Sequence, residues 1–344
     1  MLSDKIEEIQ RLQLTPLDFL PQDDLREKIV DLVLRGVPTN VHTEVNRQLL
    51  ELRQKLLEEN VEQVKVVVFG GGTGLSNIIG GDSRRMGWAE KPFSGLKEIF
   101  PHTKSIVCVT DNGGSTGELM KDLPLVALGD MRHVLLSSIQ LRNLQKYFSI
   151  SYRKAVEVAS ILSTVFNKRF LVKFEKNSDE FNELSLQLQR LPDELCKYLS
   201  MLLDDLFTDQ RLRDPLNRPN CLGNLLIATA VYREVGSSYS NIDLAQNLEI
   251  LHTAMFCGLN RLAKNIGAEE RAVLPCTSTP AQLKVLYTNG VQGVGEHKLG
   301  QSRRGVPVES VQVDYFDTIR IYGEVFEDIA EADILILAPG SLYS

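Results

Sequence analysis

A glycine-rich loop directly follows a short run of β-branched residues in this chain. Residues 66–76 read Val-Val-Val-Phe-Gly-Gly-Gly-Thr-Gly-Leu-Ser. The apolar run predicts a buried parallel strand, and the apolar spacing after the loop predicts a helix. Gly70, Gly71, Gly72 and Gly74 let the backbone turn sharply and approach a ligand without Cβ clashes. Because backbone N–H groups and the helix dipole would then point at an anion, the stretch predicts a phosphate-binding edge in an α/β sheet.

The loop differs from the two common nucleotide-binding fingerprints. No lysine follows Gly74, as a Walker A loop requires, and Leu75 occupies the position of the third Rossmann glycine. A plain glycine-rich turn that leads into a helix therefore remains the alternative for this loop taken alone.

A second loop of the same kind favours a ligand site. Residues 105–110 predict another buried strand, which ends in Asp111-Asn112-Gly113-Gly114-Ser115-Thr116-Gly117. Ligands of open α/β sheets bind outside the carboxyl ends of the strands, so Asp111 is expected where chemistry or cation binding would take place. The alternative role for Asp111 is that of a helix N-cap.

Three further segments carry polar groups next to apolar elements. Gly129-Asp130-Met131-Arg132-His133 offers an acid and a fixed positive charge before the predicted helix 134–140. Arg132 could neutralise phosphate charge or form a structural Arg–carboxylate pair. Gly223-Asn224 opens another apolar helix, and the predicted strand 334–337 leads into Pro339-Gly340-Ser341.

In this order, the motifs Gly-Gly-Gly-Thr-Gly-Leu-Ser, Asp-Asn-Gly-Gly-Ser-Thr-Gly, Gly-Asp-Met-Arg, Gly-Asn-Leu-Leu and Pro-Gly-Ser-Leu-Tyr resemble the CofD-like superfamily. Its two branches are 2-phospho-L-lactate transferase and the YvcK-type proteins, which bind UDP-sugars and are linked to carbon metabolism and cell shape. The residues of the first two motifs are closer to those of the YvcK branch. The family usually has a second aspartate where this chain has Asn112, and the loss of one negative charge weakens the case for metal-assisted chemistry.

The resemblance implies a nucleotide diphosphate or nucleotide-sugar as the ligand. Asn224 would hold the base or ribose, Asp111 would be the catalytic residue of a transferase, and Asp130 would hold Mg²⁺. The remaining residues expected to contact the ligand, mostly through backbone N–H groups and hydroxyls at the diphosphate, are Gly71, Gly72, Thr73, Gly74, Asn112, Gly113, Gly114, Ser115, Arg132, Gly223, Gly340 and Ser341.

Two classes of function follow from this site. An enzyme would transfer a phospho-acyl group from a nucleotide-activated donor to a hydroxyl, with positioning and electrostatic stabilisation as the sources of rate. A regulator would bind a UDP-sugar without turnover and use the binding energy to bias a conformation or a partner surface. Asn112 and the YvcK-like sequences of the motifs favour the regulator.

Composition limits the partners. The net charge of −7, with no basic stripe to offset it, argues against a nucleic-acid partner. The chain has no apolar run long enough for a spanning helix, and its first segment is polar. We therefore expect no membrane partner and a cytoplasmic location. The five scattered cysteines predict neither a disulfide framework nor a zinc site, and each is expected to be buried.

The predicted fold is a doubly wound, Rossmann-like parallel α/β sheet with three additions. Residues 1–60 predict a helical appendage, which would be a regulatory or dimer-forming module or a cap on its own core, and 64–344 form the nucleotide-binding domain. Within it, 145–220 predict an all-helical insertion, and the runs 272–275, 283–288, 308–313 and 319–322 predict a small antiparallel excursion.

Other expectations concern single residues and the end of the chain. The arginines of 211–218 could place a cation over the ligand edge, and His133, His252 and Trp88 are expected to be packed rather than functional. Because related sequences continue past the Pro-Gly-Ser loop, the C-terminus is expected to be truncated.

Overall fold

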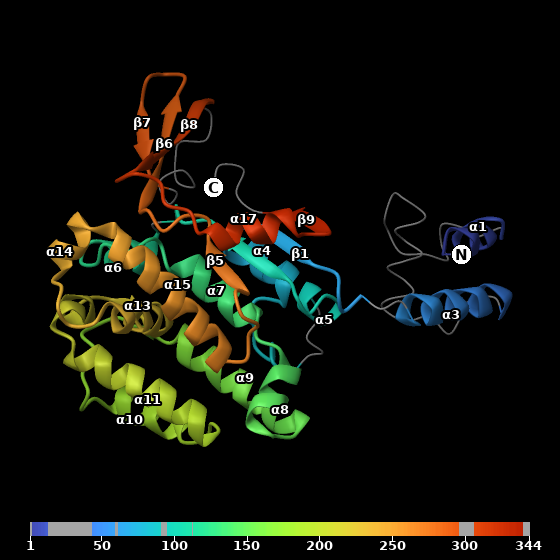
Figure 1. Cartoon of the computed structure of the whole chain (residues 1–344), viewed down its shortest axis with the longest axis horizontal. Coiled ribbons are helices and arrows are strands. Elements are labelled where there is room, and N and C mark those ends of the chain that lie inside the picture. Colours follow the sequence, from blue (N-terminus) through green and yellow to red (C-terminus); the bar gives the residue numbers. More distant parts are fainter. Residues whose placement is uncertain are drawn as a thin grey trace. The chain divides into compact units, whose positions relative to one another are not determined.

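The computed structural model describes residues 2–12, 43–58, 61–90, 95–111, 113–295 and 306–339. The chain divides into two compact units, Met1–Val61 and Glu62–Ser344, and the second carries the β-sheets (Figure 1).

The N-terminal unit contains two amphipathic helices, α1 (Leu2–Gln10) and α3 (Thr43–Glu58). Ile9 of α1 and both Leu49 and Leu52 of α3 are fully buried. An ion pair of 3.0 Å joins Lys5 to Glu51 across the two helices. The apolar stripes of the two helices therefore supply the buried side chains of this unit, while charged residues cover its outside.

A parallel four-stranded sheet forms the centre of the second unit. Its strands are β1 (Val66–Gly70), β2 (Lys104–Val107), β5 (Val273–Pro275) and β9 (Ile334–Leu337), in the order β5-β2-β1-β9. All neighbouring pairs are parallel, so all four carboxyl ends lie at one edge. β1 pairs with β2 on one side and β9 on the other, which makes the end of β1 the topological switch point at which ligands of such sheets bind.

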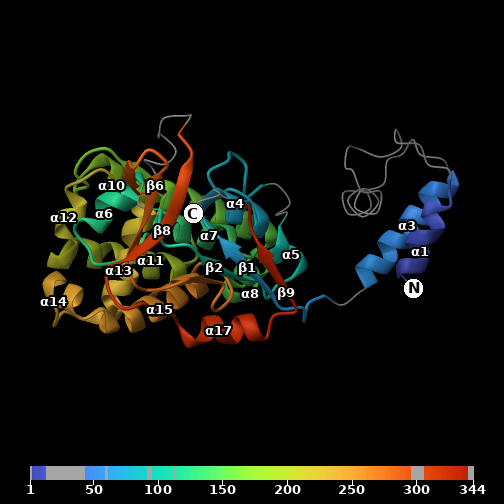
Figure 2. The same cartoon turned by 90° about the horizontal axis from the view of Figure 1, so that it is seen from above.

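The two faces of the sheet are covered by different helices. Val66 and Val68 are buried in the large core, whereas Val67 between them belongs to a smaller core with Tyr322 and Val325. Tyr322 and Val325 lie at the start of α17 (Gly323–Ala330), which runs along the side of the sheet opposite to α4 and α7 (Figure 2). Helices on both faces of a parallel sheet confirm the predicted Rossmann-like α/β class.

The large core is built mainly from helices. Its central helix is α13 (Leu222–Val235), in which every residue from Leu222 to Tyr232 is buried, and α15 (Leu248–Asn265) packs along it. The other helices of this unit are α4 (Gly72–Ile79), α5 (Leu96–Ile99), α6 (Gly114–Met120), α7 (Gly129–Ser137), α8 (Leu141–Phe148), α9 (Tyr152–Asn167), α10 (Asp179–Leu188), α11 (Asp193–Thr208), η2 (Gln210–Leu212), α12 (Arg213–Leu216) and α14 (Asn241–Gln246).

The segment 145–220 is not entirely helical, which corrects the sequence prediction. Two short strands, β3 (Arg169–Phe170) and β4 (Asn220–Cys221), pair antiparallel and place Arg169 opposite Cys221. Strands of two residues are too short to show the alternation from which strands are predicted. This pairing is important because both Arg169 and Cys221 belong to the surroundings of the candidate site.

A three-stranded antiparallel sheet confirms the predicted excursion, with different membership. Its strands are β6 (Ala281–Tyr287), β7 (Gln292–Val294) and β8 (Val308–Tyr315), in the order β7-β6-β8. Residues 272–275 instead join the parallel sheet as β5, and 319–322 form no strand. The latter stretch leads into α17 and buries Tyr322, whereas Ile319 and Ile321 are exposed. In the described part of the chain, we find no helix with the length and apolarity needed to cross a membrane. All five cysteines are free thiols, and only Cys221 is fully buried.

Candidate functional site

The carboxyl ends of β1 and β2 open into a cavity of about 660 Å³, which we name the sheet-edge cavity. The loops after the two strands, the first turns of α6 and α7, two separate arginines and the end of β9 surround it. Its lining residues are Gly70, Gly71, Gly72, Thr73, Gly74, Arg84, Cys108, Asp111, Gly113, Gly114, Ser115, Thr116, Gly129, Asp130, Arg132, His133, Arg169 and Ala338.

The first glycine loop brings bare backbone to this cavity. Gly72 has φ +51°, a left-handed conformation that favours glycine, and it begins helix α4. The N-cap residue is Gly71, which has no side chain of its own to cap the first N–H groups of the helix. A Cβ on Gly71 would lie 2.5 Å from Oδ2 of Asp130, and one on Gly72 would lie 3.0 Å from Oδ1. The loop therefore offers helical N–H donors to an anion and leaves room for nothing larger than glycine beside Asp130.

The second loop is held by Asp111. Its Oδ1 accepts a hydrogen bond of 2.9 Å from the backbone N–H of Gly113. Gly113, rather than Asp111, occupies the N-cap position of α6, and that cap has no side-chain hydrogen bond. Gly114 follows with φ +53°. Asp111 thus stabilises the turn from its own strand end and lines the cavity, which corrects its alternative role as an N-cap residue.

The third polar segment, residues 129–133, lies inside a helix rather than before one. Helix α7 begins at Gly129, so Asp130, Arg132 and His133 occupy its first two turns. We expected the helix to begin near residue 134. A glycine at its start and the absence of a capping side chain hid the true beginning from the sequence pattern. The helix consequently points its N-terminus, with Asp130, at the first glycine loop.

Arg132 is buried without an acidic partner. Only 2% of its surface is exposed, and no carboxylate of the described residues lies within 4.0 Å of its guanidinium. Nη1 donates to Sγ of Cys221, and Nη2 donates to Nε2 of His133 over 2.7 Å. Nε has no hydrogen-bond partner among the described residues. The described residues thus supply no structural Arg–carboxylate pair, which was the alternative for this residue.

His133 supports Arg132 as a neutral imidazole. Burial, followed by the nearby charges of Arg132 and Arg84, lowers the pKa of His133 to about 3. Since Nε2 accepts from the guanidinium, Nδ1 carries the ring proton, and this N–H has no described partner. From its sequence context, His133 is predicted to be packed without a function. Its ring is indeed 8% exposed, but it also lines the cavity and fixes the guanidinium.

Two arginines of the cavity were not foreseen. Arg84 donates to Oδ1 and Oδ2 of Asp82, and its Nη2 also donates to Oγ1 of Thr73 over 2.8 Å. The hydrogen bonds from Arg84 hold the pKa of Asp82 below its usual range. Arg169, at the start of β3, is exposed and also lines the cavity. No local motif marks either residue, because the turn after α4 and the pairing of β3 with β4 bring them to the site.

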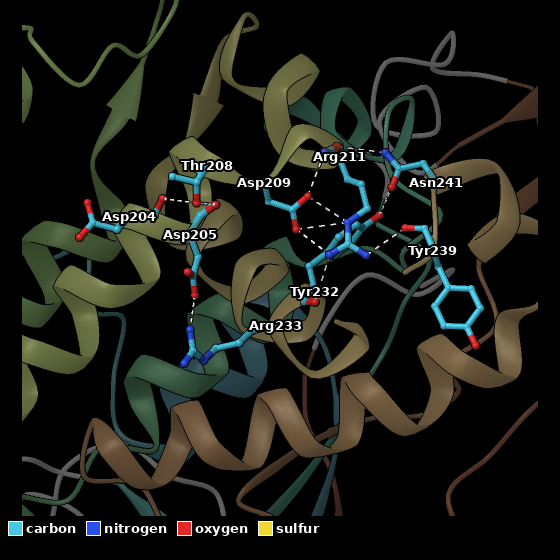
Figure 3. A network of polar contacts seen from close by, with 9 residues as sticks. All are labelled: Asp204, Asp205, Thr208, Asp209, Arg211, Tyr232, Arg233, Tyr239 and Asn241. Atoms are coloured by element: carbon cyan, nitrogen blue, oxygen red, sulfur yellow. Dashed lines mark hydrogen bonds and ion pairs between the residues drawn. The ribbon is translucent and has the colours of Figure 1, made fainter. Parts of the chain in front are cut away.

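The arginines of 211–218, by contrast, lie elsewhere. Arg211 donates to both carboxylate oxygens of Asp209 and to the backbone oxygens of Tyr239 and Tyr232, and it stacks 4.8 Å from the Tyr232 ring (Figure 3). These residues border a separate cavity of about 930 Å³, which we name the Arg211 cavity. Arg218 pairs with Asp122 over 2.9 Å. Neither arginine lines the sheet-edge cavity, so the expected cation over the ligand edge comes from Arg84 and Arg169 instead.

Gly223 and Asn224 lie behind the cavity wall. A Cβ on Gly223 would clash with the carbonyl oxygen of Phe166 and would lie 2.5 Å from Cδ of Arg132. The glycine therefore allows Arg132 to pack against α13. Asn224 is fully buried, with Nδ2 3.5 Å from Oγ of Ser115 and no partner for Oδ1. Their predicted contacts with a ligand remain a prediction, and Asn112, Gly340 and Ser341 lie outside the described residues.

The electrostatics of the sheet-edge cavity favour an anion. Its lining carries three arginines and two aspartates, a net charge of +1, although the whole chain carries −7. No group of three metal-ligating side chains is found in the residues that the structure describes. Mg²⁺, however, commonly binds through one or two carboxylates together with phosphate oxygens. Asp130 and Asp111 fit that arrangement because both line the cavity beside the glycine loops.

The chain matches a known protein family over most of its length. The sequence profile of the family described as 2-phospho-L-lactate transferase CofD matches residues 66–344. A protein of Halalkalibacterium halodurans named gluconeogenesis factor is 25% identical over 284 residues, which are 83% of this chain and 59% of that protein. A Thermotoga maritima protein, named as a candidate gluconeogenesis factor, is 27% identical over 283 residues, with coverages of 82% and 59%. The chain thus spans about three fifths of the length of these relatives.

A crystal structure of a Bacillus halodurans protein is also similar. It matches with a TM-score of 0.47 and 23% sequence identity, over 81% of this chain and 60% of that one.

Proposed function

The chain belongs to the CofD family, and we propose that it binds a nucleoside diphosphate or a nucleotide-sugar in the sheet-edge cavity as a non-catalytic regulator of the YvcK type. The diphosphate would lie between the N–H groups of the two glycine loops and the guanidinium of Arg132.

The single observation that carries this proposal is the state of Arg132. A buried guanidinium without a carboxylate is costly, because burial removes water and no opposite charge replaces it. Among the described residues, Nε of Arg132 and Nδ1–H of the adjacent His133 nonetheless have no hydrogen-bond partner. Both donors belong to residues that line the cavity. A diphosphate in the cavity supplies the negative charge that the buried Arg132 lacks.

The glycine loops support the same ligand. The N-cap residue of α4 is a glycine and makes no side-chain cap, and helix N-termini bind phosphate through their first N–H groups. Gly72 and Gly114 both have left-handed φ values that free the backbone to face the cavity. Arg84 would add a second positive charge near Thr73.

Mg²⁺ would fit this arrangement as a bridge between protein and ligand. Asp130 and Asp111, which both line the cavity, would hold the ion together with oxygens of the diphosphate. When bound, the ion would neutralise phosphate charge. Asp130 lies in the first turn of α7, where the helix dipole stabilises its negative form.

Two observations favour regulation over catalysis. The relatives described above carry the name gluconeogenesis factor, and a metabolic factor of this kind fits a protein that reports ligand concentration. The loop after β2 also has Asn112 in place of an acidic residue, so it carries one carboxylate less for metal-assisted chemistry.

A transferase is the second candidate, and Asp111 is the observation that favours it. Its carboxylate follows the central strand β2 and lines the cavity. A hydroxyl acceptor at that edge would meet Asp111, which could orient it or accept its proton. The family pattern carries the name of such an enzyme.

Calorimetric titration with UDP, GDP, UDP-glucose and GDP-mannose, with and without Mg²⁺, tests the proposal. We expect one binding site per chain for at least one nucleotide. Incubation of the same nucleotides with candidate hydroxyl acceptors should release no nucleoside monophosphate if the protein is a regulator. Steady release that falls about 10²–10⁴-fold in Asp111→Asn would instead establish the transferase. Failure of every nucleotide to bind the folded protein would refute both functions.

A further inference from the structure

Two cysteines are neighbours at the carboxyl edge of the parallel sheet. In the pairing of β2 with β5, Val107 is opposite Pro275, and the residue that follows each strand is a cysteine, Cys108 after β2 and Cys276 after β5. The backbone N–H of Cys276 donates to the carbonyl of Val107 over 2.8 Å, so the pairing continues to these two residues. Neighbouring strands are about 4.7–4.9 Å apart, within the range of about 4.4–6.8 Å between the Cα atoms of a disulfide.

The two side chains share one face of the sheet. Side chains alternate along a strand, so each cysteine faces the same side as the residue two positions before it. Those two residues, Ile106 and Leu274, are opposite each other in the sheet and both belong to the smaller core. Cys276 packs against that same core. The fold therefore brings together two thiols that are far apart in the sequence.

The electrostatics of the pair agree with this proximity. Burial, followed by the charge of Cys108, raises the pKa of Cys276 to about 11. Burial, followed by the charges of Cys276 and Cys108, also raises the pKa of Tyr315 on β8. Like charges disfavour each other's ionisation when they are close, at about 4–6 Å. These shifts are those of two adjacent sulfur atoms with the Tyr315 hydroxyl nearby.

Cys108 is the thiol of the pair that a small oxidant reaches from the ligand site. It is half-buried and lines the sheet-edge cavity, whereas Cys276 is not part of that lining. Its Sγ lies 3.0 Å from Oγ1 of Thr110, the residue before Asp111. Asp111 in turn accepts from the N–H of Gly113 and holds the second glycine loop. A change at Cys108 therefore reaches the loop that faces the ligand.

We infer that Cys108 and Cys276 form a reversible disulfide when the protein meets a peroxide, and that this bond weakens ligand binding in the sheet-edge cavity. The first part depends on the two cysteines alone. The second part rests on the proposed function, because it requires a nucleotide in that cavity.

The oxidation takes two balanced steps. Sγ of Cys108, as a thiolate, attacks one oxygen of hydrogen peroxide, so that an S–O bond forms and the O–O bond breaks. The other oxygen leaves as hydroxide, which takes up the proton released by the thiol and becomes water. Sγ of Cys276 then attacks Sγ of Cys108, the S–S bond forms, and the S–O bond breaks. The hydroxyl group leaves as water with the proton of Cys276.

The electrons of this reaction come from the two thiols and reduce the peroxide. The sulfenic acid formed first on Cys108 is neutral, so its charge no longer opposes the ionisation of Cys276. A dithiol such as dithiothreitol reverses the disulfide by exchange and is itself oxidised to a disulfide.

The disulfide changes the ligand site through the second glycine loop. The new bond draws Sγ of Cys108 toward Cys276 and away from Oγ1 of Thr110. It also ties the end of β2 to the end of β5. The loop that begins at Asp111 thereby loses a contact at its base, and its N–H groups are placed less well for an anion.

Mass spectrometry of the peroxide-treated full chain tests the first part. After alkylation of the remaining thiols, we expect two peptides joined through Cys108 and Cys276, which dithiothreitol separates. Cys276→Ser should instead leave Cys108 as a sulfenic acid that dimedone traps. Cys257→Ser is the matched control, because Cys257 is exposed on α15 and its removal should leave the linked peptides unchanged.

Calorimetric titration tests the second part, with the nucleotide that binds the reduced wild type. The oxidised protein should bind it about fivefold or more weakly, and dithiothreitol should restore the affinity. Treated and untreated Cys108→Ser should differ by less than about twofold, because no bond to Cys276 can form without this sulfur. This comparison separates the disulfide from peroxide damage elsewhere in the chain.

Two results would overturn the inference while leaving the proposed function intact. The first is a folded wild type in which peroxide produces no link between Cys108 and Cys276. The second is a linked protein whose nucleotide affinity equals that of the reduced form. A reduced wild type that binds none of UDP, GDP, UDP-glucose and GDP-mannose refutes the proposed function and the effect on binding, and the mass spectrum alone then decides whether the disulfide forms.

Discussion

The sheet-edge cavity and the Arg211 cavity are both lined by arginines, but among the described residues the sheet-edge cavity alone contains a buried arginine without a counter-charge. Arg211, 11% exposed, faces both oxygens of Asp209 and two backbone carbonyls. Arg233 in the same wall pairs with Asp205. Arg132 is buried more deeply, yet its described partners are a thiol and a neutral imidazole.

This difference separates a structural arginine from one that awaits a ligand. Where the fold supplies the acceptors, a guanidinium ties elements together, as Arg211 ties η2 to α13 and to the loop before α14 (Figure 3). Where the fold supplies only a thiol and a ring nitrogen, the remaining donors are available to an anion. Cavity volume does not distinguish the two kinds of arginine, since the Arg211 cavity is the larger of the two.

The largest expected effect comes from Gly72. Gly72→Val would place a branched side chain at a left-handed φ of +51° and against Oδ1 of Asp130. We expect nucleotide affinity to fall by about 100-fold or more, which corresponds to about 2.7 kcal/mol. Calorimetry measures the affinity, and far-UV circular dichroism verifies the fold. The control is Gly290→Val, which introduces the same strain at φ +80° in the hairpin turn after β6 and should leave binding unchanged.

A smaller effect, on stability alone, is expected from Arg211. Arg211→Gln would leave the partly buried Asp209 without its cation and should lower the free energy of unfolding by about 1–3 kcal/mol. Chemical denaturation measures this loss, and nucleotide affinity should remain within about twofold of the wild type. Weakened nucleotide binding together with unchanged stability would reverse the roles assigned to the two cavities.

The smallest effect concerns pH and His133. Its pKa is lowered to about 3 in the folded protein, against 6.5 for the free side chain, so the unfolded chain binds the extra proton between these values. Stability contributed by the neutral ring is present above pH 6.5 and is lost as the pH falls toward 3. Between pH 7 and 5.5 the expected loss is about 1 kcal/mol. Denaturation at the two pH values should show this difference in the wild type and not in His133→Asn. Identical losses would mean that His133 is solvated.

The strands and loops of this site could be predicted from sequence because their signals are local. The run before Gly70 and the run before Asp111 are apolar and β-branched, and each ends in glycines, so β1, β2 and both loops were located within a few residues. The antiparallel sheet was expected as well. Residues 272–275 were assigned to it wrongly, because an apolar run of four residues does not reveal which strand it pairs with.

The charged wall of the site could not be predicted in the same way. Arg84 and Arg169 reach the cavity through a turn after α4 and through strands of two residues, and neither has a periodic pattern. In the sequence, the arginines at 211–218 are equally suitable as cations over the ligand edge of the sheet. Only the folded structure distinguishes them, since the positions of Asp209 and Asp122 decide which guanidinium is already paired.

The most direct test of the unpaired-arginine site is the affinity of Arg132→Gln beside that of Arg211→Gln. Each variant removes one buried guanidinium and keeps a polar side chain of similar length. Calorimetric titration with the nucleotide that binds the wild type should show a loss of about tenfold or more in Arg132→Gln, and less than twofold in Arg211→Gln. Wild-type affinity in a folded Arg132→Gln protein would contradict the claim that this arginine binds the ligand.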